Sequence, residues 1–146
     1  MAQPLDLSNY LPYLINRVGF ALVENFTAAA DLKKSGLTID MWRVLAALSN
    51  RGEQRQVDLS GMTSIDVSTM SRLVSRLVRL GCVTRSRSEK SSREVVVAIT
   101  PKGRALMQRL IPIARELERT ASAGLSAKEL AVAKSLLARM YKNFAP

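Results

Sequence analysis

The sequence predicts a mainly α-helical fold of the α+β class: a winged helix-turn-helix head beside helices from both ends of the chain. Three observations predict it. Apolar residues recur at helical spacing over most of the 146 residues. Two short helical patterns are joined by a brief turn at Thr63-Ser64-Ile65. Residues 83–99 then change to the period of strands, which indicates a β-hairpin.

The N-terminal part contains two predicted helices. The first covers about Tyr10 to Ala30, and we expect Ser8 or Asn9 to cap its start. Its apolar stripe is Leu11, Ile15, Val18, Leu22 and Phe26. Thr38 is expected to cap the second helix, which stops at Asn50-Arg51-Gly52.

The head continues with a short helix, about Gln56 to Met62, and a longer one that Asp66 opens and Gly81 closes after Leu80. A hairpin with a basic tip follows. Thr100-Pro101 then begins a long helix that reaches about Ala123. Ser126 and Glu129 form a capping box for the last helix, whose stripe is Leu130, Ala133, Leu137, Met140 and Phe144.

These patterns divide the chain into three expected regions. Residues 1–36 form an N-terminal dimerisation helix, 37–99 the winged helix-turn-helix domain, and 100–146 the C-terminal dimerisation helices. The first and last helices carry more apolar residues than one small head domain can bury. We therefore expect a homodimer, with a bundle within one chain as the alternative.

Charge and composition limit the classes of function. Lys and Arg number 22 against 12 Asp and Glu, a formal net charge of +10, which favours an acidic partner such as nucleic acid. A single cysteine, Cys82, and the absence of histidine exclude an internal disulfide, a Cys/His zinc site and a His-dependent catalytic triad. The acidic residues are scattered singly along helical faces. We therefore predict no enzyme, no cofactor and no metal.

The expected location is the cytoplasm, with no membrane partner. No apolar run approaches the roughly 18–20 residues that cross a bilayer. Residues 1–9 also lack the basic and apolar regions of a signal peptide.

The helix from Asp66 to Leu80 carries the strongest functional pattern. Plotted at about 100° per residue, its inner side collects aliphatic residues: Val67, Met70, Leu73, Val74, Leu77, Val78 and Leu80. Its outer side collects hydroxyl and guanidinium groups and no acid: Ser68, Thr69, Arg72, Ser75, Arg76 and Arg79. An ordinary solvated helix face mixes the two signs of charge.

This outer side suits the major groove of duplex DNA. We expect Ser68, Thr69 and Arg72, near the N-terminal end, to reach base edges. Arg76 and Arg79 are expected to bind phosphate, and Ser71 is a further candidate contact on this helix. The alternative is a basic face that contacts only solvent.

The hairpin adds Arg85, Arg87, Lys90 and Arg93. From Asp66 to Arg104 the sequence has nine Lys and Arg against three acids, so about a quarter of the chain carries most of its net charge. A wing of this kind can place an Arg in the minor groove or along phosphates. The alternative is a solvated loop.

The sequence resembles the MarR family of bacterial regulators. The match is carried by residues 67–74 (VSTMSRLV) with Leu77, by Leu80-Gly81-Cys82-Val83, and by residues 97–106 (VAITPKGRAL). The last run is similar to the family's Leu-Thr-x-x-Gly-x-x-Leu run, with Ile99 in the place of its first Leu. It departs from the family's Asp-Arg-Arg run in the wing, where this chain has Ser91-Ser92-Arg93. Arg87, Lys90 or Arg93 is therefore the candidate for the minor groove.

The resemblance implies a homodimer on a pseudo-palindromic operator that represses genes near its own and is released by a small molecule. Such ligands, often phenolic or aromatic acids, bind between the dimerisation helices and the head. Our candidates there are Tyr13, Arg17, Phe20 and Trp42. An Arg beside aromatic rings suits an aromatic carboxylate or its thioester. Alternatively, Phe20 and Trp42 belong to the core and Arg17 is an exposed charge.

The function predicted is therefore a sequence-specific, double-stranded DNA-binding transcriptional regulator, expected to be a repressor, that responds to a small aromatic or anionic ligand. The alternative class is a basic architectural or RNA-binding protein without a ligand response. Such a protein would expose aromatic side chains for base stacking, and the hairpin has none.

Overall fold

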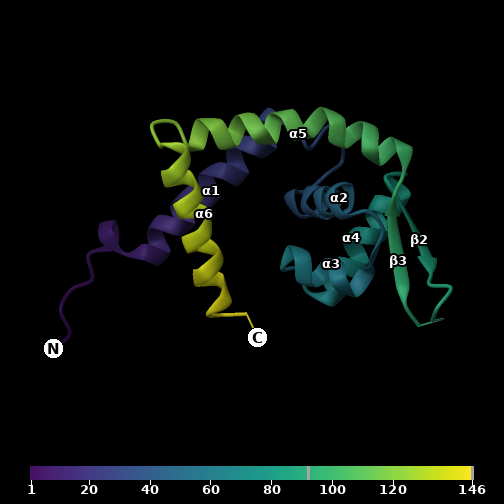
Figure 1. Ribbon diagram of the computed structural model, residues 1–146, viewed down its shortest axis with the longest axis horizontal. Coiled ribbons are helices and arrows are strands. Elements are labelled where there is room, and N and C mark those ends of the chain that lie inside the picture. The colour runs from purple at the N-terminus through teal and green to yellow at the C-terminus, as the bar shows by residue number, and fades with distance from the viewer. Residues whose placement is uncertain (92, 146) are drawn as a thin grey trace.

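In the computed structural model, the long helix α5 extends from the head to the place where the two terminal helices, α1 and α6, lie (Figure 1). The structure describes residues 1–91 and 93–145. Ser92, in the predicted wing, and Pro146, at the end of the predicted C-terminal region, lie outside the described residues. The described elements, in chain order, are η1 (Leu7–Asn9), α1 (Leu11–Ala29), α2 (Ile39–Arg51), β1 (Gln54–Arg55), α3 (Gln56–Thr63), α4 (Val67–Arg79), β2 (Val83–Arg87), β3 (Val95–Ile99), α5 (Pro101–Ala121) and α6 (Ala127–Lys142).

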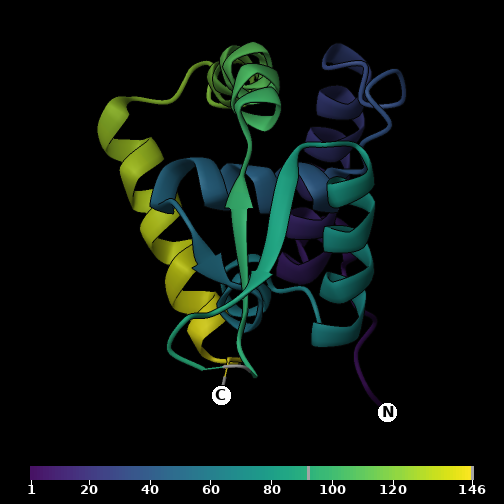
Figure 2. The same cartoon turned by 90° about the vertical axis from the view of Figure 1, so that its right-hand side faces the viewer.

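The core of the molecule lies inside the head. The inner faces of α2, α3 and α4 meet there, β3 covers one side, and α1 and α5 add residues from above. Figure 2 shows α4 standing beside the sheet, with α2 behind it. The fully buried side chains of this core are Leu32, Met41, Val44, Leu45, Leu48, Leu59, Met70, Val74, Leu77, Val97, Met107 and Leu110.

The sheet is antiparallel and has the order β1-β3-β2. The predicted hairpin is confirmed, with Val83 opposite Ile99 and Arg87 opposite Val95. The short strand β1 was not predicted, and it pairs Gln54 with Val97. Two residues are too few to show an alternating pattern, so this strand has no sequence signal of its own.

The turn between wing and long helix is fixed by Thr100, Gly81 and Gly103. The Thr100 hydroxyl donates to the Gly81 carbonyl (2.6 Å) and accepts from the Gly103 N–H (3.1 Å). Gly81 has a φ of +75°, which a residue with a Cβ rarely adopts. A Cβ on Gly103 would overlap the Cys82 carbonyl oxygen and approach Ile99 Cγ1 to 2.7 Å. This part of the motif therefore serves close packing of α5 on the sheet.

The predicted helix caps are confirmed at Thr38, Asp66, Thr100 and the Ser126–Glu129 capping box. The cap predicted at Ser8 or Asn9 is wrong. These residues belong to the short 3-10 helix η1, which Asp6 caps, and α1 begins after Tyr10 without a side-chain cap. Pro12 in the first turn of α1 has no N–H, so one of the donors that a cap would satisfy is missing.

The terminal helices leave apolar side chains in solvent. In α1, Leu11, Ile15 and Val18 are 49%, 41% and 57% exposed. Helix α6 has no buried residue between Ala127 and Lys142, all of which the structure describes. In one chain these stripes are therefore only partly covered.

Candidate nucleic-acid interface

Helix α4 begins at a carboxylate that holds the hydroxyls of its first turn. One Asp66 oxygen accepts from the Thr69 N–H (2.8 Å) and the Ser68 hydroxyl (2.7 Å), and the other accepts from the Thr69 hydroxyl (2.6 Å). These hydrogen bonds, first that from the Thr69 hydroxyl, hold the pKa of Asp66 well below its ordinary value. Asp66 therefore remains ionised and fixes Ser68 and Thr69 at the start of the helix.

The Thr69 hydroxyl also accepts a hydrogen bond from Arg72. The distance from Arg72 Nη2 to Thr69 Oγ1 is 3.3 Å. Asp66, Thr69 and Arg72 thus form a chain of hydrogen bonds along one side of the first turn. Such a chain orients the Arg72 guanidinium before any base or phosphate is present.

The outer side of α4 is an exposed basic surface, as predicted. Arg72, Arg76 and Arg79 are exposed, and the helix itself contains no acid. A shallow groove of about 300 Å³ follows this side, lined by Ser71, Arg72, Ser75, Arg76 and Arg79. Guanidinium groups that line a groove can contact base edges or phosphate oxygens.

The predicted inner side of α4 is wrong at two positions. Val67 is 60% exposed and Val78 is 40% exposed, whereas Met70, Val74 and Leu77 are buried. Val67 is the first residue of α4, and Val78 is the last but one. An exposed valine beside Ser68 adds an apolar group at the start of the outer side.

Arg85 of the wing is bound to α4. Its guanidinium donates to the Ser75 hydroxyl (3.0 Å) and to the Ser71 carbonyl (2.7 Å), and Ser75 donates to the same carbonyl (3.0 Å). Ser71 and Ser75 thus lie toward the wing, at the edge of the outer side. Sequence reasoning placed Arg85 among the basic wing residues but missed its contact with α4.

The base of the wing is held by a second arginine that the sequence analysis did not identify. Arg55 Nη1 pairs with Glu94 at 2.8 Å, and Arg55 Nε pairs with Asp58 at 2.8 Å. The hydrogen bond to Asp58, followed by that to Glu94, raises the pKa of Arg55. Arg55 thus ties β1 and α3 to the start of β3.

The remaining wing candidates lie on the exposed part of the hairpin. Arg87 ends β2, and Lys90 and Arg93 lie in the exposed turn that follows. The Lys90 N–H donates to the Ser88 hydroxyl (3.2 Å), and the Arg93 N–H to the Ser91 hydroxyl (3.4 Å). Two serine hydroxyls therefore accept from the backbone of this turn, in addition to the backbone hydrogen bond from the Ser88 N–H to the Glu94 carbonyl (2.8 Å).

The four predicted ligand residues lie in three different places. The Arg17 guanidinium lies over the Tyr13 ring at 5.5 Å, so these two are neighbours on α1. Trp42 of α2 packs against Phe26, with ring centroids 4.8 Å apart. Phe20 is 69% exposed and lines a separate cleft of about 470 Å³ with Val23, Glu24, Thr27, Ala28, Asp31 and Lys33.

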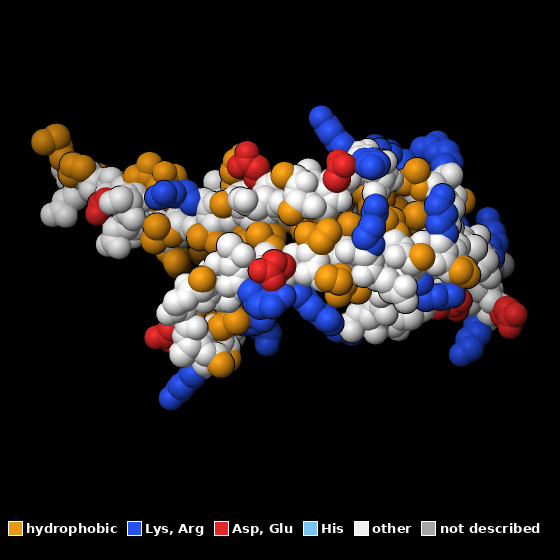
Figure 3. Space-filling model, turned by 90° about the horizontal axis from the view of Figure 1, so that it is seen from above, with side chains coloured by type: hydrophobic (Ala, Val, Ile, Leu, Met, Phe, Trp, Pro, Cys, Tyr) orange, Lys and Arg blue, Asp and Glu red, His pale blue; other side chains and the backbone are white. Residues whose placement is uncertain are grey.

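Viewed from above, Lys and Arg side chains are most numerous over the head, and others lie on the terminal helices (Figure 3). Hydrophobic side chains are exposed along the whole of this face, including the N-terminal end. No helix within residues 1–91 and 93–145 is both long and apolar enough to span a membrane.

A family model described as MarR family matches residues 37–95, which cover α2, α3, α4 and most of the wing. The head of this chain is therefore similar to the MarR family. Members of the MarR family are DNA-binding transcriptional regulators rather than enzymes, and this agrees with the basic helix and wing described above.

Two curated relatives of this chain are repressors. It is 32% identical over 104 residues to the repressor NicR of Pseudomonas putida, covering 71% of this chain and 66% of NicR, just under two thirds. It is 29% identical over 130 residues to the repressor Rv2887 of Mycobacterium tuberculosis, covering 89% of this chain and 92% of that protein.

Solved MarR-family structures share the fold. BpsR of Bordetella bronchiseptica, whose DNA binding is regulated by 6-hydroxynicotinic acid, superposes with a TM-score of 0.79 at 29% identity and covers 90% of this chain and 98% of its own. A MarR-family regulator of Silicibacter pomeroyi superposes with a TM-score of 0.84 at 28% identity and covers 97% and 96%.

Proposed function

We propose that this chain forms a homodimer that represses transcription by binding a pseudo-palindromic DNA operator through α4 and the wing. The observation that carries the proposal is the outer side of α4, where Asp66, Thr69 and Arg72 form a connected chain of hydrogen bonds. Arg76 and Arg79 extend the basic surface toward the end of the helix. The proposal assigns base contacts to Ser68, Thr69 and Arg72, and phosphate contacts to Arg76 and Arg79.

The wing supplies the second contact. Arg87, Lys90 and Arg93 are exposed beside a hairpin whose base is held by the Arg55–Glu94 pair. We assign the minor-groove contact to one of these three side chains. Arg85 has a different role, because its guanidinium is bound to α4.

Dimer formation is supported by the apolar stripes on α1 and α6. A cleft of about 440 Å³ lies between α1, α5 and α6, and its lining includes Leu22, Leu117, Leu125 and Leu130. A second copy of the chain would cover such surface and place two copies of α4 on adjacent half-sites. We therefore retain residues 1–36 and 100–146 as the dimerisation region.

A direct test is the mass of the purified chain in solution. Leu137→Glu, on the exposed face of α6, is expected to yield monomers and to reduce operator affinity. Val57→Glu, at a similarly exposed apolar position on α3, serves as the matched control and should remain dimeric. A wild-type chain that is monomeric at micromolar concentration would overturn the proposal.

The proposed effector is a small aromatic acid that Arg17 binds beside Tyr13. Arg17 is exposed, and no carboxylate of the described residues forms an ion pair with it. A guanidinium next to an aromatic ring suits a ring that carries a carboxylate. The regulation of BpsR by 6-hydroxynicotinic acid makes this compound the first probe for the present chain.

The effector proposal is tested by titrating the operator complex with 6-hydroxynicotinate, salicylate and their neutral amides. The acids are expected to weaken DNA binding and to change the fluorescence of Trp42, the single tryptophan. Arg17→Gln should abolish both effects and leave ligand-free DNA binding intact. If neither acid changes DNA affinity or fluorescence, the aromatic-acid assignment is wrong.

A further inference from the structure

The end of α6 touches the turn of the helix-turn-helix. The Tyr141 hydroxyl lies 2.8 Å from the Ser64 hydroxyl, and the two residues are 77 positions apart in the sequence. Figure 1 shows α6 descending from the far end of α5 to the level of α3. Near its middle, α6 is tied to α5 by the Lys134–Glu118 ion pair. A helix of the terminal region thus reaches the part of the head that precedes α4.

Ser64 is the residue at which the chain turns between α3 and α4. It ends α3 in the left-handed conformation, with a φ of +57°. Such a conformation is costly for a residue with a Cβ and persists only where surrounding contacts hold it. Within the head, the backbone N–H of Ser64 donates to the Ser60 carbonyl, and the next residue, Ile65, is buried.

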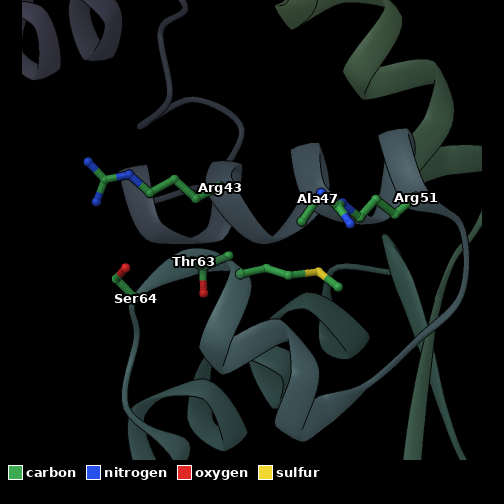
Figure 4. Close-up of a pocket in the computed structure, with 6 residues that line it drawn as sticks. Arg43, Ala47, Arg51, Thr63 and Ser64 are labelled. Carbon is green, nitrogen blue, oxygen red and sulfur yellow. The ribbon is translucent and has the colours of Figure 1, made fainter. Parts of the chain in front are cut away.

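The outward side of this turn borders open space. A cleft of about 480 Å³ separates α2 from the end of α3 and is lined by Arg43, Ala47, Arg51, Met62, Thr63 and Ser64. Figure 4 shows Thr63 and Ser64 at one end of this cleft, below Arg43. Within the described residues, Tyr141 is the partner of the Ser64 side chain. The hydroxyl pair is therefore what restrains the turn from outside the head.

The turn leads directly into the groups that are proposed to read DNA. Ile65 alone separates Ser64 from Asp66, whose carboxylate holds Ser68 and Thr69, and Thr69 in turn accepts from Arg72. A change in the position of Ser64 therefore shifts the start of this hydrogen-bond chain.

We propose that Tyr141 is a positioning residue for DNA recognition: its hydroxyl fixes Ser64 and thereby the orientation of Asp66, Thr69 and Arg72. This inference rests on the proposed role of Arg72 in base readout. It links α6, assigned to dimerisation, to the specificity of α4. The hydrogen bond is expected to affect discrimination between DNA sequences rather than overall affinity, because Arg76 and Arg79, which are assigned to phosphate, lie further along the helix.

The test is a double-mutant cycle with Tyr141→Phe and Ser64→Ala. Phe keeps the ring and removes only the hydroxyl, so the fold of α6 is retained. The affinities of each full-length variant are measured for the tightest duplex selected from a random pool and for random duplex. Each single variant should lower the ratio of these affinities about two- to fivefold, as expected for the loss of one neutral hydrogen bond. The double variant should lower this ratio no further than either single variant does.

Tyr10→Phe is the matched control, since Tyr10 is another partly exposed tyrosine in a terminal segment, and it should leave the ratio unchanged. Affinity for random duplex and its salt dependence should be the same in all four variants as in the wild type. Amide hydrogen exchange at residues 64–69 should be faster in Tyr141→Phe, which a surface tyrosine without this role would not cause.

An unchanged ratio in Tyr141→Phe, or additive losses in the double variant, would overturn the inference while the proposed function stands. A wild-type protein that does not discriminate between duplexes would instead overturn the proposed function, and the inference with it.

Discussion

Arg85 on β2 donates a hydrogen bond to the Ser75 hydroxyl of α4 at 3.0 Å, so the wing and the basic helix are joined side by side. The same guanidinium reaches the Ser71 carbonyl at 2.7 Å. From its charge alone, Arg85 would be counted as a DNA contact. Its guanidinium instead organises the surface that is proposed to contact DNA. The two parts of the interface are expected to approach the duplex as one rigid unit.

The first prediction follows from the planar geometry of this guanidinium. Arg85→Lys keeps the charge but cannot donate two hydrogen bonds in fixed directions. We expect it to weaken operator binding nearly as much as Arg85→Ala, by about three- to tenfold, the effect of one or two hydrogen bonds. The measurement is fluorescence anisotropy of labelled operator at constant salt. If the lysine variant binds like the wild type, Arg85 acts as a simple phosphate contact.

The second prediction concerns acid stability. The pKa of Asp66 is lowered in the folded state, so its stabilising effect is complete above the unfolded value, about 3.9, and is lost as the pH falls toward the folded value. Asp66→Ala should lower the melting temperature near neutral pH. The difference from the wild type should shrink below about pH 4. A difference that stays constant from pH 7 to pH 3 would show that the carboxylate charge contributes nothing.

The third prediction compares two glycines. Gly103→Ala places a Cβ against the Cys82 carbonyl and Ile99, so we expect a loss of about 1–3 kcal/mol in the free energy of unfolding. Gly61→Ala is the control, because a Cβ at this helical position in α3 meets open space. It should be neutral or stabilise the fold by about 0.5–1 kcal/mol. Urea unfolding of both variants decides the matter, and equal effects would contradict the packing assigned to Gly103.

Much of the fold could be predicted because its signals are local. Thr38, Asp66, Thr100 and Ser126 each cap a helix from a position next to it in the sequence. The strands of the wing follow from five-residue runs with a change of period. The predicted cap of α1 was wrong because Asp6 caps a separate 3-10 helix that contains Ser8 and Asn9. Helix α1 begins only after it, with Pro12 in its first turn.

The finer structure of the site could not be predicted because it rests on contacts between distant residues. Arg55 meets Glu94 across 39 positions, and Tyr141 meets Ser64 across 77. A helical plot places Ser71 and Ser75 near the outer side of α4. It cannot show that Arg85 of β2 binds them, because it contains only the residues of one helix. The helical plot also does not show that Val67 and Val78 are exposed, because exposure depends on the residues that pack against α4 from elsewhere in the chain.

The most direct test of the whole account is the effect of Arg72→Ala on discrimination between selected operator and random duplex, with Arg79→Ala measured in parallel. We predict that Arg72→Ala loses about 1–3 kcal/mol of binding free energy for the operator and relaxes the preference for particular bases. Arg79→Ala should weaken binding to all sequences alike and lower the salt slope by about one. If Arg72→Ala instead weakens both duplexes equally, α4 does not read bases through its first turn and the central claim is wrong.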